Sequence, residues 1–199
     1  HEFKSPLTSI RQLAEMLQSG RVPSEERRRQ YYDVLLEQSE RLALLTDNIL
    51  SLAKIEEGRA DLKLEPTDVG ALLTEVVGSF RERVRHEGFD IELKLGDRLP
   101  RLALDRAALS QAMTNLVDNA VKYSGESRKV EVAALVEGPS LTIAVRDFGI
   151  GIHKADIDRV FERFFRGGDE LTRTVKGSGL GLTLVREIVE AHGGEVHVA

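Results

Sequence analysis

Residues 115–123 read Asn-Leu-Val-Asp-Asn-Ala-Val-Lys-Tyr, a pattern that combines helical apolar spacing with two regularly placed amides. Asn115 and Asn119 are four residues apart, so they lie on one face of a helix. The apolar residues between them indicate that another side of the same helix is buried. Asp105 suits the N-cap of this helix, which we predict over 106–123.

The segments around this helix alternate between apolar and polar residues, as half-buried strands do. We predict strands and helices as follows: strands at 62–64, 89–95, 102–104, 130–136 and 141–145, and helices at 69–86, capped by Asp68, and at 180–191. The last two strands pair around the turn Gly138-Pro139. The pattern predicts an α+β sandwich, with helices on one face of a mostly antiparallel sheet.

The first part of the chain has a purely helical pattern. Apolar residues recur every three or four positions up to Leu17, and Gly20 and Pro23 interrupt them before a second helix that runs from Ser24 to about Glu57. The second helix carries a heptad seam of Leu35, Gln38, Leu42, Leu45, Ile49 and Leu52. The two helices therefore form a hairpin, whose apolar stripe either pairs with a second copy in a four-helix bundle or packs on the same chain.

Composition narrows the class of protein. Of 199 residues, 41% are hydrophobic, which suffices for packed cores, and the net charge of −5 argues against nonspecific nucleic-acid binding. Cysteine is absent, so no disulfide or thiolate metal site exists, and no apolar run approaches the ~20 residues of a membrane helix. The sequence begins on His1 without a helix cap and stops within a predicted strand at 196–199. We therefore expect a longer protein, truncated here at both ends.

Two glycine-rich stretches flank a phenylalanine-rich one. Residues 147–151 read Asp-Phe-Gly-Ile-Gly, residues 161–166 read Phe-Glu-Arg-Phe-Phe-Arg, and residues 177–182 read Gly-Ser-Gly-Leu-Gly-Leu. Glycine lets the backbone approach a ligand closely, and a helix N-terminus favours phosphate. A lone glycine pair usually marks only a turn, and the Gly-Lys-Ser/Thr ending of a P-loop is missing.

Together with His-Glu-Phe-Lys-Ser-Pro-Leu at 1–7, these stretches resemble the phosphoacceptor, asparagine, glycine and phenylalanine motifs of sensor histidine kinases over nearly the whole chain. The resemblance implies a dimeric helical phosphoacceptor domain at 1–60, followed at 61–199 by an ATP-binding domain of the Bergerat (GHKL) fold. It implies a cytoplasmic kinase that phosphorylates His1 and donates the phosphoryl group to an aspartate of a response regulator. Membrane attachment would come only from an upstream region.

The resemblance also implies roles for individual residues. Glu2 would accept a proton from His1, and Ser5, where relatives often carry Thr or Asn, would orient a water in a phosphatase reaction. Asn119 would ligate Mg²⁺ between the ATP phosphates, with support from Asn115. The remaining nucleotide contacts would be Lys122 (phosphate), Tyr123 (adenine stacking), Asp147 (adenine amino group), the backbone at Gly149, Gly151, Gly177, Gly179, Leu180 and Gly181, and the lid cations Arg163, Arg166, Arg173 and Lys176.

Two other classes of protein stay open. An ATPase of the same fold, such as gyrase or an Hsp90-like chaperone, would hydrolyse ATP without labelling itself, but such enzymes carry a glutamate where this chain has Asn115. A nonenzymatic dimeric scaffold would keep the nucleotide site as a relic. In the kinase, the ATP-binding domain must move against the hairpin, and we expect residues 59–66 to act as the hinge.

Overall fold

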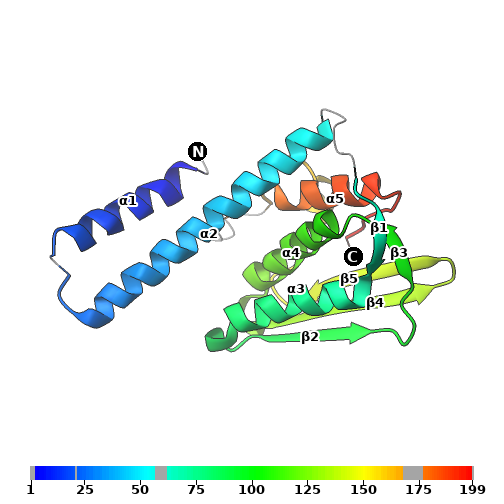
Figure 1. Ribbon diagram of the computed structural model, residues 1–199, viewed down its shortest axis with the longest axis horizontal. Helices are drawn as coiled ribbons and strands as arrows, with labels where there is room; N and C mark the ends of the chain where they lie inside the picture. Colours follow the sequence, from blue (N-terminus) through cyan, green and yellow to red (C-terminus); the bar gives the residue numbers. More distant parts are fainter. Residues whose placement is uncertain (1–2, 21, 57–61, 168–176, 199) are drawn as a thin grey trace. The chain divides into compact units, whose positions relative to one another are not determined.

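The computed structural model describes residues 3–20, 22–56, 62–167 and 177–198 (Figure 1). The chain separates into two compact units, 1–57 and 58–199, each of which is described by itself. Within the described ranges, no helix is both long and apolar enough to cross a membrane.

The first unit is the predicted helical hairpin. Helix α1 spans Lys4–Gln18 and helix α2 spans Glu25–Glu56, and the two lie side by side (Figure 1). Gly20 adopts a φ of 67°, in the left-handed region that ends many helices. The hydroxyl of Ser24 accepts a hydrogen bond from the backbone N–H of Arg27 at 3.1 Å, which confirms the predicted start of α2.

The heptad seam of α2 is only partly buried within this chain. Gln38, Leu45 and Leu52 are buried, whereas Ile49 is 37% exposed. Asn48 is buried instead, which the heptad assignment did not anticipate. The hairpin also exposes large apolar side chains: Leu7, Met16, Tyr32, Val34, Leu36, Ile49 and Leu50.

The described residues of the second unit form five strands in two sheets. The strands are β1 (Glu65–Asp68), β2 (Asp90–Leu95), β3 (Arg101–Leu104), β4 (Lys129–Glu137) and β5 (Ser140–Asp147). Strands β1 and β3 form an antiparallel pair, and the larger sheet has the order β2-β4-β5. Strand β4 is antiparallel to β5, as predicted, but parallel to β2. The sheet is thus mixed, a pairing that the alternation pattern of single strands cannot reveal.

In the part of this unit that the structure describes, the α-helices are α3 (Val69–Arg83), α4 (Arg106–Tyr123) and α5 (Gly181–Ala191). Asp68 and Asp105 accept hydrogen bonds from the N–H groups of Ala71 and Ala108, so both predicted N-caps are confirmed. Short 3₁₀ helices occur at Arg85–Glu87, Gly125–Ser127 and Lys154–Arg159. The last of these lies between the glycine-rich stretch 147–151 and the phenylalanine-rich stretch 161–166.

The core lies between α3, α4 and one face of the larger sheet, as Figure 1 shows. Along β4, Val130, Val132 and Ala134 are buried at alternate positions, and they pack with Leu73 and Val117 of the two helices. This burial of alternate strand residues against apolar helix faces is the layer arrangement predicted from the sequence.

Two predicted strands are wrong. Leu62–Leu64 is not extended, because the N–H of Leu64 donates to the carbonyl of Leu62 at 3.0 Å and closes a tight turn; strand β1 begins only at Glu65. Residues 195–198 form no strand either, and residue 199 lies outside the described ranges. Alternation over three or four residues is too short to distinguish a strand from a turn.

Part of the predicted hinge is held by the second unit. Residues 59–61 lie outside the described ranges, but the N–H of Lys63 donates to Oδ2 of Asp105 at 3.0 Å, and Pro66 pairs with Ala103 in the β1–β3 ladder. The predicted hinge therefore extends too far toward the C-terminus, since the chain from Lys63 onward is anchored.

Asp105 and His192 join the ends of two helices. The N–H of Asp105 donates to Nε2 of His192 at 3.0 Å, and Nδ1 of His192 lies 2.7 Å from the carbonyl of Ile188. Because Nε2 accepts a hydrogen bond, the proton of a neutral ring lies on Nδ1, which donates to that carbonyl. His192 thus connects the end of α5 to the start of α4.

These contacts affect the titration of Asp105. Burial by itself raises the pKa of this carboxyl, but hydrogen bonds from Ala108, Lys63 and Ala107, together with the nearby His192, outweigh it and hold the pKa below its ordinary value of 3.8. A carboxyl with a lowered folded-state pKa stabilises the fold above the unfolded-state pKa. That stabilisation is lost as the pH falls through the folded-state pKa.

We expect Asp105→Asn to lower the free energy of unfolding at pH 7 by about 1 kcal/mol, because the amide is a weaker acceptor than the charged cap. The deficit should shrink as the pH falls below 3.8 and through the lowered folded-state pKa, because wild-type Asp105 is protonated only there. Urea unfolding of the wild type and of Asp105→Asn at pH 7 and at pH 3.5 measures this difference in the free energy of unfolding. Asp105→Ala, which also loses the cap, should be less stable than Asp105→Asn at both pH values. A deficit of Asp105→Asn that does not change with pH would contradict this account.

Candidate nucleotide site

Helix α4 and the start of α5 meet at Asn115. The side chain of Asn115 is buried, and its Nδ2 donates to the carbonyl of Gln111 at 3.1 Å. A Cβ at Gly181, the first residue of α5, would lie 3.2 Å from Oδ1 of Asn115. Asn119, one turn further along α4, is half-buried. The structure therefore brings the asparagine motif against the second glycine motif, through a glycine that leaves the amide oxygen room.

The first glycine motif lies against the other end of α4. Asp147 ends β5, and its Oδ1 accepts a hydrogen bond from the N–H of Gly149 at 3.0 Å. A Cβ at Gly149 would lie only 1.8 Å from the carbonyl oxygen of Tyr123. The N–H of Ile150 also donates to that oxygen, at 3.4 Å. Residue 149 must consequently be glycine, and its close approach places the Asp147 turn beside the end of α4.

The second glycine motif is packed on the phenylalanine motif. Gly179 has a φ of 68°, and a Cβ there would lie 2.7 Å from the carbonyl carbon of Phe164 and from the carbonyl oxygen of Phe165. The carbonyl of Gly179 accepts a hydrogen bond from the N–H of Phe164 at 3.0 Å. In addition, the hydroxyl of Thr183 in α5 donates to the carbonyl of Phe161 at 2.9 Å. These contacts anchor the phenylalanine motif to the N-terminal half of α5.

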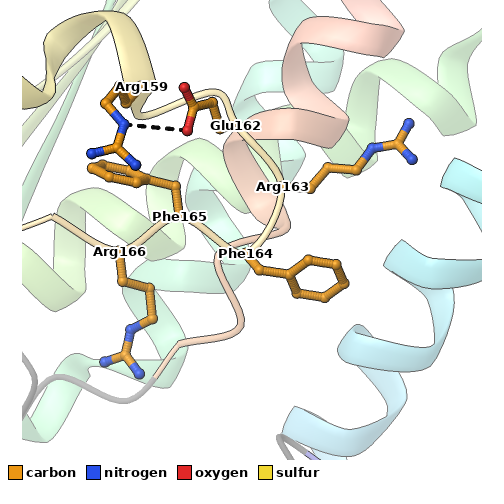
Figure 2. A pocket seen from close by; sticks show the side chains of 6 residues that line it. All are labelled: Arg159, Glu162, Arg163, Phe164, Phe165 and Arg166. Atoms are coloured by element: carbon orange, nitrogen blue, oxygen red, sulfur yellow. Dashed lines mark hydrogen bonds and ion pairs between the residues drawn. The ribbon is translucent and has the colours of Figure 1, made fainter.

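The three phenylalanines of this motif have different environments. Phe161 is buried, whereas Phe164 is 69% exposed and has a φ of 60°, unusual for a residue with a Cβ. Phe165 carries the guanidinium of Arg159 over its ring at 4.3 Å, and Phe164 points away from this pair (Figure 2). Phe161 therefore packs this motif into the second unit, whereas the Phe164 side chain is largely exposed.

The predicted lid cations are only partly described. Nη2 of Arg163 lies 3.9 Å from Oε1 of Glu187 in α5, so this guanidinium forms an ion pair within the protein. Arg163 and Arg166 also line an open hollow of about 550 Å³, together with Arg159, Glu162, Phe164 and Phe165 (Figure 2). None of these six residues belongs to the asparagine motif or the first glycine motif. Arg173 and Lys176 lie outside the described residues.

The predicted phosphate contact Lys122 is already paired. Its ammonium contacts Oδ2 of Asp118, and Nη2 of Arg83 in α3 lies 3.0 Å from Oδ1 of the same carboxylate. Asp118 is buried, with 7% of its surface exposed. Sequence reasoning missed this carboxylate, although its i,i+4 spacing to Lys122 on a helix was a usable signal.

The phosphoacceptor residues are not placed relative to this site. His1 and Glu2 lie outside the described residues, and Ser5 is exposed in the first turn of α1. The other site residues lie in the second unit: Tyr123 is half-buried at the end of α4, Gly151 has a φ of 68°, Gly177 is half-buried, and Leu180 is buried as the N-cap of α5. Their ligand roles stay predictions.

Comparison with known proteins identifies the class to which this fold and site belong. Residues 104–199 match the family of histidine kinase-, DNA gyrase B- and HSP90-like ATPases, and residues 1–58 match the His kinase A phosphoacceptor domain. The region that holds the asparagine and glycine motifs is thus an ATPase-type domain, and the helical hairpin that precedes it is a phosphoacceptor domain.

Relatives with both parts identify the family. The chain is 34% identical over its full length to the alginate biosynthesis sensor protein KinB of Pseudomonas aeruginosa, of which it spans 33%. A structure of the mycobacterial sensor histidine kinase MprB is 30% identical, with a TM-score of 0.58 over 68% of this chain and 85% of that one. Full-length ShkA in complex with AMPPNP is 27% identical, with a TM-score of 0.69 over all of this chain and 41% of that one. The chain belongs to the sensor histidine kinases.

Proposed function

We propose that this chain is the catalytic core of an ATP-dependent protein-histidine kinase in a two-component system. It phosphorylates its own His1 and then donates the phosphoryl group to an aspartate of a response regulator. Family membership supports this proposal, and the related ShkA was solved with AMPPNP. The chain spans about a third of the length of its relative KinB.

The proposed domains are a phosphoacceptor domain at 1–60 and an ATP-binding domain at 61–199. Their boundary is supported by the division of the chain into compact units at 57/58 and by the end of the phosphoacceptor match at residue 58. The anchoring of Lys63 on Asp105 further supports a boundary before residue 63.

The observation that carries the proposal is the convergence of three sequence motifs on one helix and its neighbour. Gly149 is pressed on Tyr123, and Gly181 leaves room for Asn115. Both glycine motifs are therefore positioned around the helix that carries Asn119. An adenine contacted by Asp147 and Tyr123 and a triphosphate near the start of α5 are the ligand parts that suit these groups.

The residues at this site fit a magnesium ion. The amide oxygen of Asn119 is a hard, neutral ligand, and Mg²⁺ is commonly held by one or two protein oxygens, with phosphate oxygens and water filling the remaining positions. Among the residues that the structure describes, no cluster of three His, Cys, Asp or Glu side chains forms an alternative metal site. When bound with ATP, the ion would neutralise charge that builds up on the phosphates.

The proposed chemistry is transfer rather than hydrolysis. A ring nitrogen of His1 forms a bond to the γ-phosphorus, the bond from that phosphorus to the β–γ bridging oxygen breaks, and ADP leaves with the electron pair. Glu2 accepts the proton of the other ring nitrogen. Asn115 occupies the position where the fold's ATPases carry a water-activating glutamate, and a neutral amide cannot act as a general base.

The hairpin supports the proposed homodimer. The apolar side chains that α1 and α2 expose need a partner surface, and a second hairpin in a four-helix bundle provides one. Ser5, exposed four residues after His1, supports a further proposed activity, in which it orients a water that hydrolyses the phosphorylated response regulator.

A labelling experiment tests the proposed kinase. We expect the protein incubated with γ-labelled ATP and Mg²⁺ to acquire a label that acid releases and base does not, as the N–P bond of phosphohistidine requires. Free phosphate without protein label would indicate the ATPase instead, and neither product would indicate the scaffold.

A further inference from the structure

The buried carboxylate of Asp118 joins two cations beside the proposed nucleotide site. Its two oxygens contact different partners: Oδ1 is 3.0 Å from Nη2 of Arg83, and Oδ2 contacts Nζ of Lys122. The side chain of Asp118 is 10% exposed, whereas those of Lys122 and Arg83 are 35% and 45% exposed. A carboxylate removed from water to this extent needs both partners to offset the loss of hydration.

The ion pair lies on the asparagine face of α4. Asn115, Asp118, Asn119 and Lys122 follow one another at i, i+3, i+4 and i+7, so they form one stripe along the helix. Lys122 projects from this stripe between Asp118 and Asn119. A phosphate bound near Asn119 through a metal ion is therefore within reach of the Lys122 ammonium. Asp118 controls the position of that ammonium.

Arg83 keeps this carboxylate in place from the neighbouring helix. Its guanidinium lies 4.1 Å from the centroid of the Phe80 ring, and Phe80 itself is buried in the core. Arg83 is thus held by a stacking contact and an ion pair together. Lys122 joins this network through the Asp118 carboxylate, which α4 carries and Arg83 of α3 holds in place.

We propose that Asp118 is a positioning residue for nucleotide binding, which holds the Lys122 ammonium on the asparagine face of α4 so that it is ready to meet the ATP phosphates. The inference rests on the proposed function. A lysine side chain has four rotatable bonds, and ordering it on binding lowers affinity. The ion pair with Asp118 meets part of that cost before the nucleotide arrives.

Loss of the Asp118 carboxylate changes ATP affinity through two opposing contributions. Asp118 is negative and repels phosphate, so its neutralisation alone would strengthen ATP binding. However, its charge is offset by two cations, and the three side chains together carry one positive charge. Without the carboxylate, Lys122 and Arg83 would extend into water, where they contribute little. We therefore expect loss of positioning to dominate.

Calorimetric titration of the whole chain with Mg·ATP tests the inference. Asp118→Asn should weaken ATP binding about tenfold, an amount that matches the ordering of one long side chain. Lys122→Gln should weaken it to a similar extent. The double variant should bind ATP within about twofold of Lys122→Gln, because Asp118 acts through Lys122. Adenosine, which lacks phosphates, should bind all three variants as it binds the wild type.

A matched control separates this role from simple stabilisation. Glu75 of α3 forms an ion pair with Arg106 of α4, about two and a half turns before Asn115 and hence on the opposite side of the helix. Glu75→Gln also removes an α3–α4 ion pair, but it should leave ATP affinity unchanged. If Asp118→Asn does not fold, Arg83→Gln serves in its place, with ATP binding about threefold weaker and no further loss in the Lys122→Gln background.

The outcomes separate this inference from the proposed function. A wild-type chain that fails to bind Mg·ATP contradicts the proposed function itself. A wild-type chain that binds, with Asp118→Asn unchanged, tighter, or multiplying the effect of Lys122→Gln, overturns only the positioning role. A purely structural Asp118 would lower the melting temperature without any coupling to Lys122 in ATP affinity.

Discussion

Replacing His1 with glutamine should abolish the acid-labile label that γ-labelled ATP leaves on the protein, with a loss of at least about 100-fold. A neutral imidazole nitrogen has a lone pair in the plane of the ring, free to attack phosphorus. The lone pair of an amide nitrogen is delocalised into its carbonyl, so glutamine keeps polarity and approximate size but is no nucleophile. Phosphorylation measured over time on the purified chain gives the ratio.

Binding of ATP should survive this change. The asparagine, glycine and phenylalanine motifs all lie in the second unit, and the described contacts between them join residues of that unit. Mg·ATP affinity of His1→Gln should therefore stay within about twofold of the wild type, which distinguishes loss of the acceptor from loss of the site.

The chain offers a matched control in its other histidines. There are five histidines in the sequence, and His86 is exposed in the short 3₁₀ helix after α3. His86→Gln should be labelled at the wild-type rate. If base-stable label persisted on His1→Gln, the acceptor would be a different residue and the proposed reaction would be wrong.

The parts of the fold that were predictable from the sequence are those that local signals determine. Helix α4 has the predicted bounds of 106–123, because an N-cap aspartate, a helical apolar period and flanking strand patterns all act within a few residues. The β4–β5 hairpin follows in the same way from its alternation and from the turn at Gly138.

Contacts between residues distant in sequence were not predictable from such signals. Asp105 and His192 are 87 residues apart, and Arg83 and Asp118 are 35 apart. Each pair depends on how helices pack over the sheet, which residue types alone do not specify. The parallel alignment of β2 with β4 has the same origin.

The candidate site contains both features that were predictable from the sequence and contacts that were not. The motifs were found from spacing, since helical period places Asn115 and Asn119 together and glycine permits close approach. The identity of the atoms approached, such as the Tyr123 carbonyl beside Gly149, became known only from the structure. Spacing likewise marked Lys122 as a phosphate contact but gave no indication of the burial of its partner Asp118.

Replacing Gly149 with alanine should destabilise the second unit and impair nucleotide binding together. The added Cβ would lie 1.8 Å from the carbonyl oxygen and 2.6 Å from the carbonyl carbon of Tyr123, and 2.7 Å from Cα of Ser124. All three are backbone atoms at the end of α4, so no side-chain rotation can relieve the overlap. The turn after β5 has to move away by an ångström or more.

The displacement should be measurable in two ways. Overpacking of this kind costs about 1–3 kcal/mol, which should lower the melting temperature by roughly 3–10 °C for a unit of this size. Moving the turn also shifts Asp147, whose carboxylate accepts from the N–H of Gly149, and breaks the hydrogen bond from Ile150 to Tyr123. We therefore expect ATP affinity to fall at least about tenfold.

Two further glycines separate the physical causes. Gly151 has a φ of 68° but no atom within 4 Å of an added Cβ, so Gly151→Ala tests backbone strain alone and should cost only about 1 kcal/mol. Gly78, in helix α3, has neither a positive φ nor a neighbour within 4 Å, so Gly78→Ala should stabilise the unit by about 0.5–1 kcal/mol. From highest to lowest, the melting temperatures should follow the order Gly78→Ala, wild type, Gly151→Ala and Gly149→Ala. If Gly149→Ala instead melted and bound ATP as Gly78→Ala does, the Asp147 turn would not be packed on the end of α4, and the convergence of motifs that supports the kinase site would be lost.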